Sequence, residues 1–263
     1  MARLLTLALA IALAICSAKK VVVVTGGSGR TGSLVYAQLK SKPEYEVRAV
    51  VTSIDKARSV LHCTNCDASE GIFLGDVTNQ STLAAPFAGA DIVVCAVGLS
   101  GNETKDVMQA VEWKGIENQV AVFAGQAGSR PLSSLMFAMV SSMGTTDPSP
   151  PKYEGGPDLF WKLQGETFLM SSGVGFAIVK PCGLVDGAGG KKTLLVGHDD
   201  SKSTMSALFH SIPRPDVASV LVEAVVSGTT GLRMDICSKP GKATTDYAAL
   251  LESAKWPWQR AGL

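Results

Sequence analysis

Short runs of apolar residues alternate along the chain with longer segments in which apolar positions recur at a helical period. Unbroken apolar runs predict strands that are buried on both faces, as in a parallel sheet. The clearest such run is residues 21–24, and further segments rich in apolar residues predict strands at 45–51, 71–78, 91–98, 137–144 and 176–179. The segments between them predict helices at residues 33–40, 81–87, 107–123 and 159–170. This alternation predicts an α/β domain built on a single doubly wound parallel sheet.

The periodicity weakens after residue 180. We expect a short strand at 194–196, a helix at 217–226, a late strand at 232–237 and a terminal helix at 247–253. Nothing in this part marks a second independent domain. We therefore interpret it as a small C-terminal region on the substrate side of one domain that spans residues 19–263.

The N-terminus carries a pattern of its own. Arg3 precedes an apolar run from Leu4 to Ile15, and small residues follow up to Ala18. This order is typical of a cleaved secretory signal, here residues 1–18, and the run is too short to span a bilayer comfortably. The alternatives are an uncleaved anchor, extra apolar residues on a cytoplasmic protein, or the first half of a bipartite signal that reaches plastids. We expect no stable membrane span in the mature chain.

Composition narrows the class of partner. The chain has 263 residues, of which 46% are hydrophobic and 18% charged, with a formal net charge of +1. This content suits one well-packed domain. No segment gathers basic residues, which argues against nucleic acid as the main partner. A small-molecule substrate is the expected partner, and a homo-oligomer is left open.

The cysteines predict no metal centre. Cys63 and Cys66 form a single C-x-x-C, and His62 alone does not complete a zinc site. The pair is either a local disulfide, as a secreted protein allows, or two free surface thiols. Three further cysteines lie in or beside apolar runs and are expected to be small core residues: Cys95, Cys182 and Cys237.

The turn after the first strand indicates a nucleotide site. Gly26, Gly29 and Gly32 follow a strand and open a helix at the spacing G-x-x-G-x-x-G, a relative of the dinucleotide fingerprint. The first glycine allows a tight turn, the second lets the backbone approach a pyrophosphate, and the third packs helix against strand. The helix N-terminus then offers free N–H groups to the phosphates.

The end of the second strand bears on the choice of cofactor. An NAD site normally places an acidic residue there, whereas this chain has Thr52 and Ser53, which would not repel a 2′-phosphate. We expect Arg30, Lys56 and Arg58 to form a cationic pocket, with Ser53 beside the cofactor. NADP is favoured on this argument, and NAD is not excluded. The two cations after the strand have a plainer interpretation as solvated helix residues.

Three later strands end in residues suited to the same ligand. Asp76 could bind the adenine edge or could cap the next helix. Small residues close the fourth strand and permit contact with a ribose. Ser141 and Ser142 end the fifth strand, where ligands bind in open α/β sheets.

Taken together, these motifs resemble the atypical short-chain dehydrogenase/reductases of the NmrA-like branch, a family of NAD(P)-binding Rossmann proteins with plant members. The resemblance runs from residue 21 to about residue 253. It implies that the glycine loop holds the cofactor phosphates, that Ser142 is the active-site serine, and that Lys162 is the active-site lysine. The remaining cofactor contacts that it implies are Gly26, Ser28, Gly29, Arg30, Thr31 and Gly32 for phosphate, Asp76 and Val77 for adenine, Ala96 and Gly98 for ribose, and Pro181 to Leu184 beside the nicotinamide.

The chain departs from the family at two places. Members often carry arginine where this chain has Thr52. The reductase signature Tyr-x-x-x-Lys is absent, because Asp158 stands four residues before Lys162, and Tyr153 lies on a loop at the wrong spacing. In this class the tyrosine is the general acid. Lys162 could instead be an exposed helix residue without a role in the site. Ser142 could instead form hydrogen bonds with nearby backbone groups.

Three functions are compatible with these motifs. The first is an NADP-dependent oxidoreductase or isomerase acting on a small carbonyl compound, in which Ser142 polarises the carbonyl and Lys162 fixes the ribose. The second is a non-catalytic NADP-binding redox sensor or scaffold. The third is sugar-nucleotide epimerisation. The missing tyrosine and the short C-terminal region count against this function.

Overall fold

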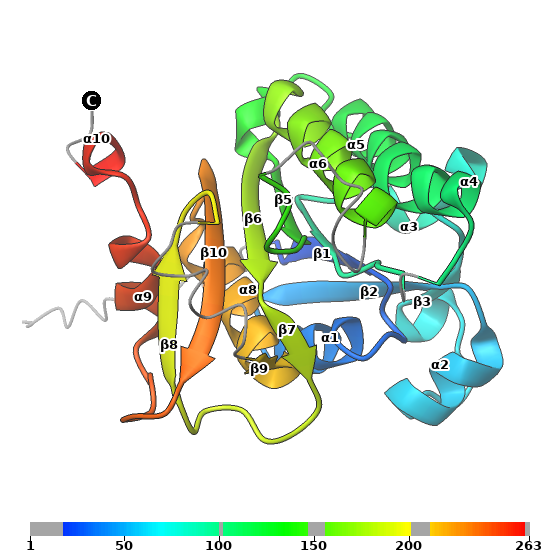
Figure 1. Cartoon of the computed structure of the whole chain (residues 1–263). Helices are drawn as coiled ribbons and strands as arrows, with labels where there is room; N and C mark the ends of the chain where they lie inside the picture. The colour runs from blue at the N-terminus through cyan, green and yellow to red at the C-terminus, as the bar shows by residue number, and fades with distance from the viewer. Residues whose placement is uncertain (1–17, 100–101, 147–155, 201–210, 261–263) are drawn as a thin grey trace, which may run out of the picture.

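A central sheet of eight strands organises the computed structural model, which describes residues 18–99, 102–146, 156–200 and 211–260. The expected signal segment thus lies outside the described residues except for Ala18, and so does most of the loop at 145–157. In the sheet the strands run β3-β2-β1-β4-β5-β6-β10-β8 (Figure 1). Their bounds are β3 Ile72–Leu74, β2 Tyr45–Val51, β1 Lys20–Thr25, β4 Ile92–Cys95, β5 Met136–Val140, β6 Gly175–Pro181, β10 Leu232–Lys239 and β8 Thr193–Gly197.

All neighbouring strands are parallel except β10 and β8, which pair antiparallel. The strand order reverses direction between β1 and β4, which creates a crevice at the carboxyl ends of these two strands. A separate parallel pair, β7 (Gly183–Val185) with β9 (Ser211–Pro213), lies beyond the end of β6. This architecture confirms the α/β class and the doubly wound sheet expected from the sequence.

Helices cover both faces of the sheet. The α-helices are α1 Gly32–Lys40, α2 Ile54–Leu61, α3 Ala84–Phe87, α4 Lys105–Met108, α5 Gly115–Gly125, α6 Gly156–Ser171, α8 Arg214–Ser227, α9 Tyr247–Ser253 and α10 Pro257–Arg260. Short 3₁₀ turns occupy Ala68–Glu70, Gln80–Leu83 and Leu132–Ser134, and a π-helical segment occupies Gln109–Lys114. None of the described helices has the length and apolar character needed to cross a membrane.

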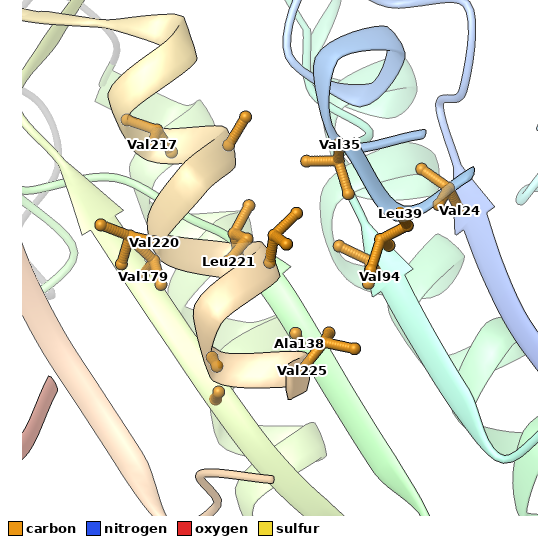
Figure 2. Packing of buried hydrophobic residues seen from close by; sticks show 14 of the residues in the cluster. Val24, Val35, Leu39, Val94, Ala138, Val179, Val217, Val220, Leu221 and Val225 are labelled. Carbon is orange, nitrogen blue, oxygen red and sulfur yellow. The ribbon is translucent and has the colours of Figure 1, made fainter. Parts of the chain in front are cut away.

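The core consists of two layers, one on each side of the sheet. Figure 2 shows the layer under α1 and α8, where Val35 and Leu221 meet the β-strand residues Val24 and Val94. On the other face Phe123 of α5 packs with Phe137 of β5. The residues Val22, Val23 and Val24 of β1 alternate between the layers, and each is fully buried. Burial on both faces explains why β1 is an unbroken valine run.

Some boundaries differ from the expected ones. The strand β2 begins and ends where the sequence predicts, whereas β3 is three residues long instead of eight. The helix expected at 107–123 continues through α4, the π segment and α5. The extra π turn matters for the site, because it carries Glu112.

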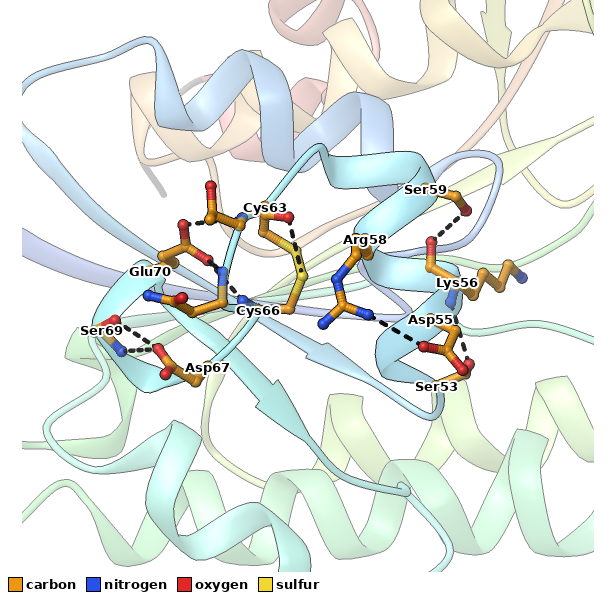
Figure 3. Close-up of a disulfide and its surroundings, with 12 residues drawn as sticks. Ser53, Asp55, Lys56, Arg58, Ser59, Cys63, Cys66, Asp67, Ser69 and Glu70 are labelled. Atoms are coloured by element: carbon orange, nitrogen blue, oxygen red, sulfur yellow. Dashed lines mark hydrogen bonds and ion pairs between the residues drawn. A yellow bond between two sulfur atoms is a disulfide. The ribbon is translucent and has the colours of Figure 1, made fainter.

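Two disulfides are present in the described part of the chain. Cys63 and Cys66 are bonded to each other, and the Glu70 carboxylate accepts the N–H groups of Asn65 and Cys66 at 2.8 and 2.7 Å beside them (Figure 3). Of the alternatives left open by the sequence, the local disulfide is the one found. Cys95 is a free buried thiol, as expected.

The expectation for Cys182 and Cys237 is wrong in one respect. Both residues are buried, but they are bonded to each other rather than being separate core thiols. The cause is the parallel pairing of β6 with β10, in which the N–H of Cys182 donates to the carbonyl of Ile236 at 2.9 Å. Because 55 residues separate the two cysteines, no local pattern in the sequence indicates this pairing.

Candidate functional site

The glycine loop lies in the crevice between β1 and β4 and has the backbone that its spacing predicts. Gly26 has a φ of +71°, and a Cβ there would lie 2.7 Å from the carbonyl oxygen of Ala96. A Cβ on Gly32 would lie 2.2 Å from the carbonyl oxygen of Gly26. The protein's own backbone therefore excludes side chains from both positions. No side chain caps the first turn of α1. Within this turn the N–H groups of Ser33 and Leu34 donate to the carbonyls of Gly29 and Thr31, at 3.0 and 3.1 Å.

A cavity of about 510 Å³ opens beside this loop at the ends of β1 to β4. It brings together most of the residues expected to hold the adenosine half of the cofactor. Those that line it are Gly26, Ser28, Gly29, Asp76, Val77, Ala96 and Gly98, together with Thr52 and Lys56.

Asp76 shapes the turn that closes this cavity. Its Oδ1 accepts both the N–H and the hydroxyl of Thr78 at 2.8 Å, and its own N–H donates to the hydroxyl of Thr82 at 2.9 Å. The alternative that Asp76 caps the next helix is wrong, because Asn79 caps that 3₁₀ turn. Val77 is buried and lines the cavity floor.

The structure separates the three cations that the sequence groups together. Lys56 lines the cavity beside Thr52 at the end of β2. Arg58 points to Asp55, at 3.2 Å, and lines neither cavity of the site. Arg30 lies on the other side of the glycine loop, 3.8 Å from Asp186. Ser53 caps α2 by accepting the N–H of Lys56 at 3.2 Å. The expected three-cation pocket is thus reduced to Lys56.

A second cavity of about 480 Å³ adjoins the first. The two share Gly29 and the segment from Ala96 to Leu99, so they form one continuous groove across the carboxyl edge of the sheet. The second cavity brings together the expected residues Arg30, Thr31, Ser142, Lys162 and Pro181 to Leu184, and it adds Asp158 and Arg214.

Ser141 and Ser142 have different partners. The buried hydroxyl of Ser141 donates to the carboxylate of Glu166 on α6. Glu166 is fully buried and also accepts Nε of Arg233 at 2.7 Å. Ser142 lines the cavity, and its hydroxyl donates to the carbonyl of Met143 at 2.8 Å. The Ser141 anchor therefore fixes the strand end with Ser142 at the cavity.

Lys162 belongs to a buried charged cluster. The residue is 8% exposed, which rules out the alternative of an exposed helix residue. Its Nζ lies 2.6 Å from Glu112 of the π segment and 3.8 Å from Asp158, one turn earlier on α6. Burial alone would lower the pKa of Lys162, but the attraction of Glu112 and Asp158 outweighs it and raises the pKa. The lysine therefore stays protonated.

Glu112 is the ion-pair partner of Lys162, and the sequence does not indicate it. Its Oε1 accepts the N–H of Leu99 at 2.9 Å, which ties the π segment to the loop after β4. The stacked rings of Trp113 and Trp161, 5.4 Å apart, hold the same segment against α6. A π turn inside a helix has no sequence signature, although such turns are frequent at functional sites.

The described part of the chain supplies no tyrosine to the site. Tyr36, Tyr45 and Tyr247 line neither cavity, and Tyr153 lies outside the described residues. The position four residues before the lysine is held by the carboxyl of Asp158.

Comparisons with known proteins agree with this geometry. A family model for NAD(P)H binding matches residues 26–227. Sanguinarine reductase from Eschscholzia californica is 29% identical over 283 aligned residues, which cover 92% of this chain and 98% of that enzyme. An uncharacterized chloroplastic protein from Arabidopsis thaliana is also 29% identical, over 87% of this chain and 74% of its own length.

Solved structures show the same fold. A candidate NAD-dependent epimerase/dehydratase from Bacillus halodurans has a TM-score of 0.70 at 24% identity, covering 89% of this chain and 99% of its own. A short-chain dehydrogenase/reductase from Veillonella parvula, solved in complex with NADP, has a TM-score of 0.60 at 12% identity, covering 86% and 97%. At these identities the likeness shows the fold alone. With the glycine cradle, the groove and the matched family model, the chain belongs to the NAD(P)H-binding family of Rossmann proteins, among the atypical short-chain dehydrogenase/reductases.

Proposed function

We propose that this protein is an NADP-dependent oxidoreductase that reduces a small carbonyl compound. The observation that carries the proposal is the continuous groove, which joins the glycine cradle to a second cavity lined by Ser142 and Lys162. A Cβ on Gly26 or Gly32 would clash with backbone atoms, so the tight turn of the nucleotide fingerprint requires glycine at both positions. When bound, the reduced nicotinamide supplies a hydride.

Ser142 and Lys162 have distinct roles in this proposal. Among the described residues the Ser142 hydroxyl has a neighbouring carbonyl as its one partner, so it can turn to donate to a substrate oxygen and polarise the carbonyl. The ammonium of Lys162 is fixed by Glu112 and stays charged, which suits binding of the cofactor ribose. Pro181 lines the same cavity and would lie beside the nicotinamide.

Support for NADP over NAD comes from the end of β2. No acidic residue stands there, and the Lys56 ammonium has no ion-pair partner among the described residues. A 2′-phosphate would gain a charge-assisted hydrogen bond from this lysine.

Relatives support one of the locations left open by the N-terminus. The Arabidopsis relative is chloroplastic, which favours the plastid among the secretory, plastid and cytoplasmic alternatives. A fluorescent protein fused after residue 263, with residues 1–18 retained, tests this choice, and secretion of the fusion would contradict it.

The alternative function is a non-catalytic NADP-binding sensor or scaffold. It is favoured by the absence of a tyrosine from the described part of the site, since tyrosine is the usual proton donor of this class.

Turnover separates the two functions. We expect NADPH oxidation with at least one member of a panel of aldehydes, ketones and quinones. Ser142→Ala should then lower kcat by about a hundredfold, the effect of losing one donor to a developing oxyanion, while the Kd for NADPH stays unchanged. Ser134→Ala, an exposed serine away from both cavities, is the matched control. Cofactor binding without turnover on the whole panel would contradict the enzyme and favour the sensor.

A further inference from the structure

Asp158 occupies the position at which related reductases carry their acid. We propose that its carboxyl is the proton donor of the reduction, in place of the missing tyrosine. This assignment rests on the proposed function and adds a catalytic residue to it. It follows from the geometry of α6, from the burial of the carboxyl, and from the way one lysine is shared between two carboxylates.

The geometry comes first. Residues four apart on a helix lie on the same face, one turn apart. Asp158 Oδ2 is accordingly 3.8 Å from Lys162 Nζ, and both side chains line the second cavity together with Ser142. The acid and the lysine thus keep the four-residue spacing of Tyr-x-x-x-Lys, with a carboxyl as the acid.

Burial makes this carboxyl hard to ionise. Asp158 is 7% exposed, and its Oδ1 is buried with no hydrogen-bond partner among the described residues. An ionised oxygen in such a position is costly, whereas a protonated carboxyl has an O–H to donate. A substrate oxygen in the cavity would accept it.

The surrounding charges act on the Asp158 carboxyl in opposite directions. Glu112 takes the close contact with Lys162 at 2.6 Å and the N–H of Leu99, so its charge is compensated. Burial is the main cause that raises the pKa of Asp158, to about 6. Lys162 lowers this pKa, while Glu112 and Glu103 raise it further. Lys162 itself is a poor donor, because its pKa is raised.

The reaction balances with this donor. The carbonyl carbon receives the hydride that the reduced nicotinamide supplies, and the carbonyl oxygen takes the proton of the Asp158 carboxyl as the C=O double bond becomes a C–OH single bond. The products are an alcohol, the oxidised cofactor and the Asp158 carboxylate. Water at the open groove returns the proton to the carboxylate. Ser142 donates a hydrogen bond to the same oxygen and loses no proton.

The test uses Asp158→Asn, which keeps the shape and removes the acid, with Asp55→Asn on the exposed surface of α2 as the matched control. We expect Asp158→Asn to lower kcat by about a hundredfold or more, the usual effect of a general acid, with the Kd for NADPH within about twofold of wild type. The wild-type rate should fall as pH rises through about 6, because the acid form disappears.

A second readout does not depend on activity. In the cofactor-free protein labelled with [¹³C]aspartate, one carboxyl resonance should titrate near pH 6 and be missing from Asp158→Asn. Three results would overturn the assignment: an unchanged rate in Asp158→Asn, a loss explained by weaker NADPH binding, or an ordinary carboxyl pKa at this position. If the wild type still reduces a carbonyl compound when one of these results is found, the proposed reductase function stands and only the role of Asp158 is contradicted. If the wild type reduces no member of the carbonyl panel, both the reductase function and the role of Asp158 are contradicted.

Discussion

Cofactor choice depends on the charge at the end of β2, where the structure leaves Lys56 as the cation that lines the adenosine cavity. We expect Lys56→Ala to raise the Kd for NADP by about tenfold or more, since a hydrogen bond to a charged group contributes about 1.5–3 kcal/mol. The Kd for NAD should change little. Fluorescence titration of both reduced cofactors measures the difference.

Two arginine variants serve as controls for Lys56. Arg58→Ala should leave both affinities unchanged, because Arg58 pairs with Asp55 and lines neither cavity. Arg30→Ala should weaken NADP and NAD alike, since Arg30 lies away from the end of β2, beside the second cavity. Equal losses of NADP and NAD in Lys56→Ala would contradict a 2′-phosphate role.

Residues of the site differ in how far the sequence predicts them. The glycines follow from spacing because their role is set by their own backbone, in which Gly26 has positive φ and Gly32 packs without a Cβ. Glu112 acquires its role only through contact with Lys162 across two helices, which no local pattern encodes. Asp158 falls between these cases, since its spacing is visible but its burial is not.

The helices and strands also differ in how far the sequence predicts them. The strand β2 is predicted to the residue, because its apolar residues recur in a short segment that turn-forming residues bound on both sides. The short strands β7 and β9 are missed, since three residues are too few to establish a period. The Cys182–Cys237 bond depends on which strands become neighbours, and the sequence by itself does not provide that order.

The two disulfides should differ in what they contribute to stability. In the chain-entropy model, closing a loop of 55 residues contributes about 4 kcal/mol, and closing the short loop at Cys63–Cys66 contributes about 2 kcal/mol. We therefore expect the Cys182→Ala/Cys237→Ala double variant to lose about twice as much free energy of unfolding as Cys63→Ala/Cys66→Ala. Urea denaturation without reductant measures both losses, and the reverse ranking would contradict the assignment of the longer bond as the main covalent restraint.

Across the whole molecule, a buried charge network joins the C-terminal region to the end of β5. Lys180 of β6 is fully buried, with Asp235 of β10 at 3.1 Å and Asp200 at 3.3 Å. Asp200 also accepts the N–H of Gly144 at 2.8 Å and that of Thr146 at 3.0 Å. The segment that follows Ser142 is thus held by a carboxylate from the turn after β8.

This network makes stability depend on pH in a direction that can be worked out. Burial opposes ionisation of Asp200, but the Gly144 N–H and the Lys180 ammonium outweigh it and lower the pKa of this carboxyl below its ordinary value. A lowered folded-state pKa contributes stability that is present above the unfolded pKa, about 3.9, and is lost as pH falls through the folded pKa. Wild type should therefore lose free energy of unfolding below about pH 4, and Asp200→Asn should lose less over the same range.

Asp158 provides a control of opposite sign. Its folded pKa is raised to about 6, so ionising it costs stability as pH rises from about 4 to about 6. Asp158→Asn should therefore gain stability relative to wild type at pH 7 but not at pH 4, whereas Asp200→Asn is less stable than wild type at pH 7. Urea midpoints of the three proteins from pH 3 to pH 7 measure these differences. Parallel pH profiles would mean that neither carboxyl changes its pKa on folding. Crossing profiles would show that the ionised carboxylate of Asp200 stabilises the fold, whereas ionisation of Asp158, the proton donor that we propose, destabilises it.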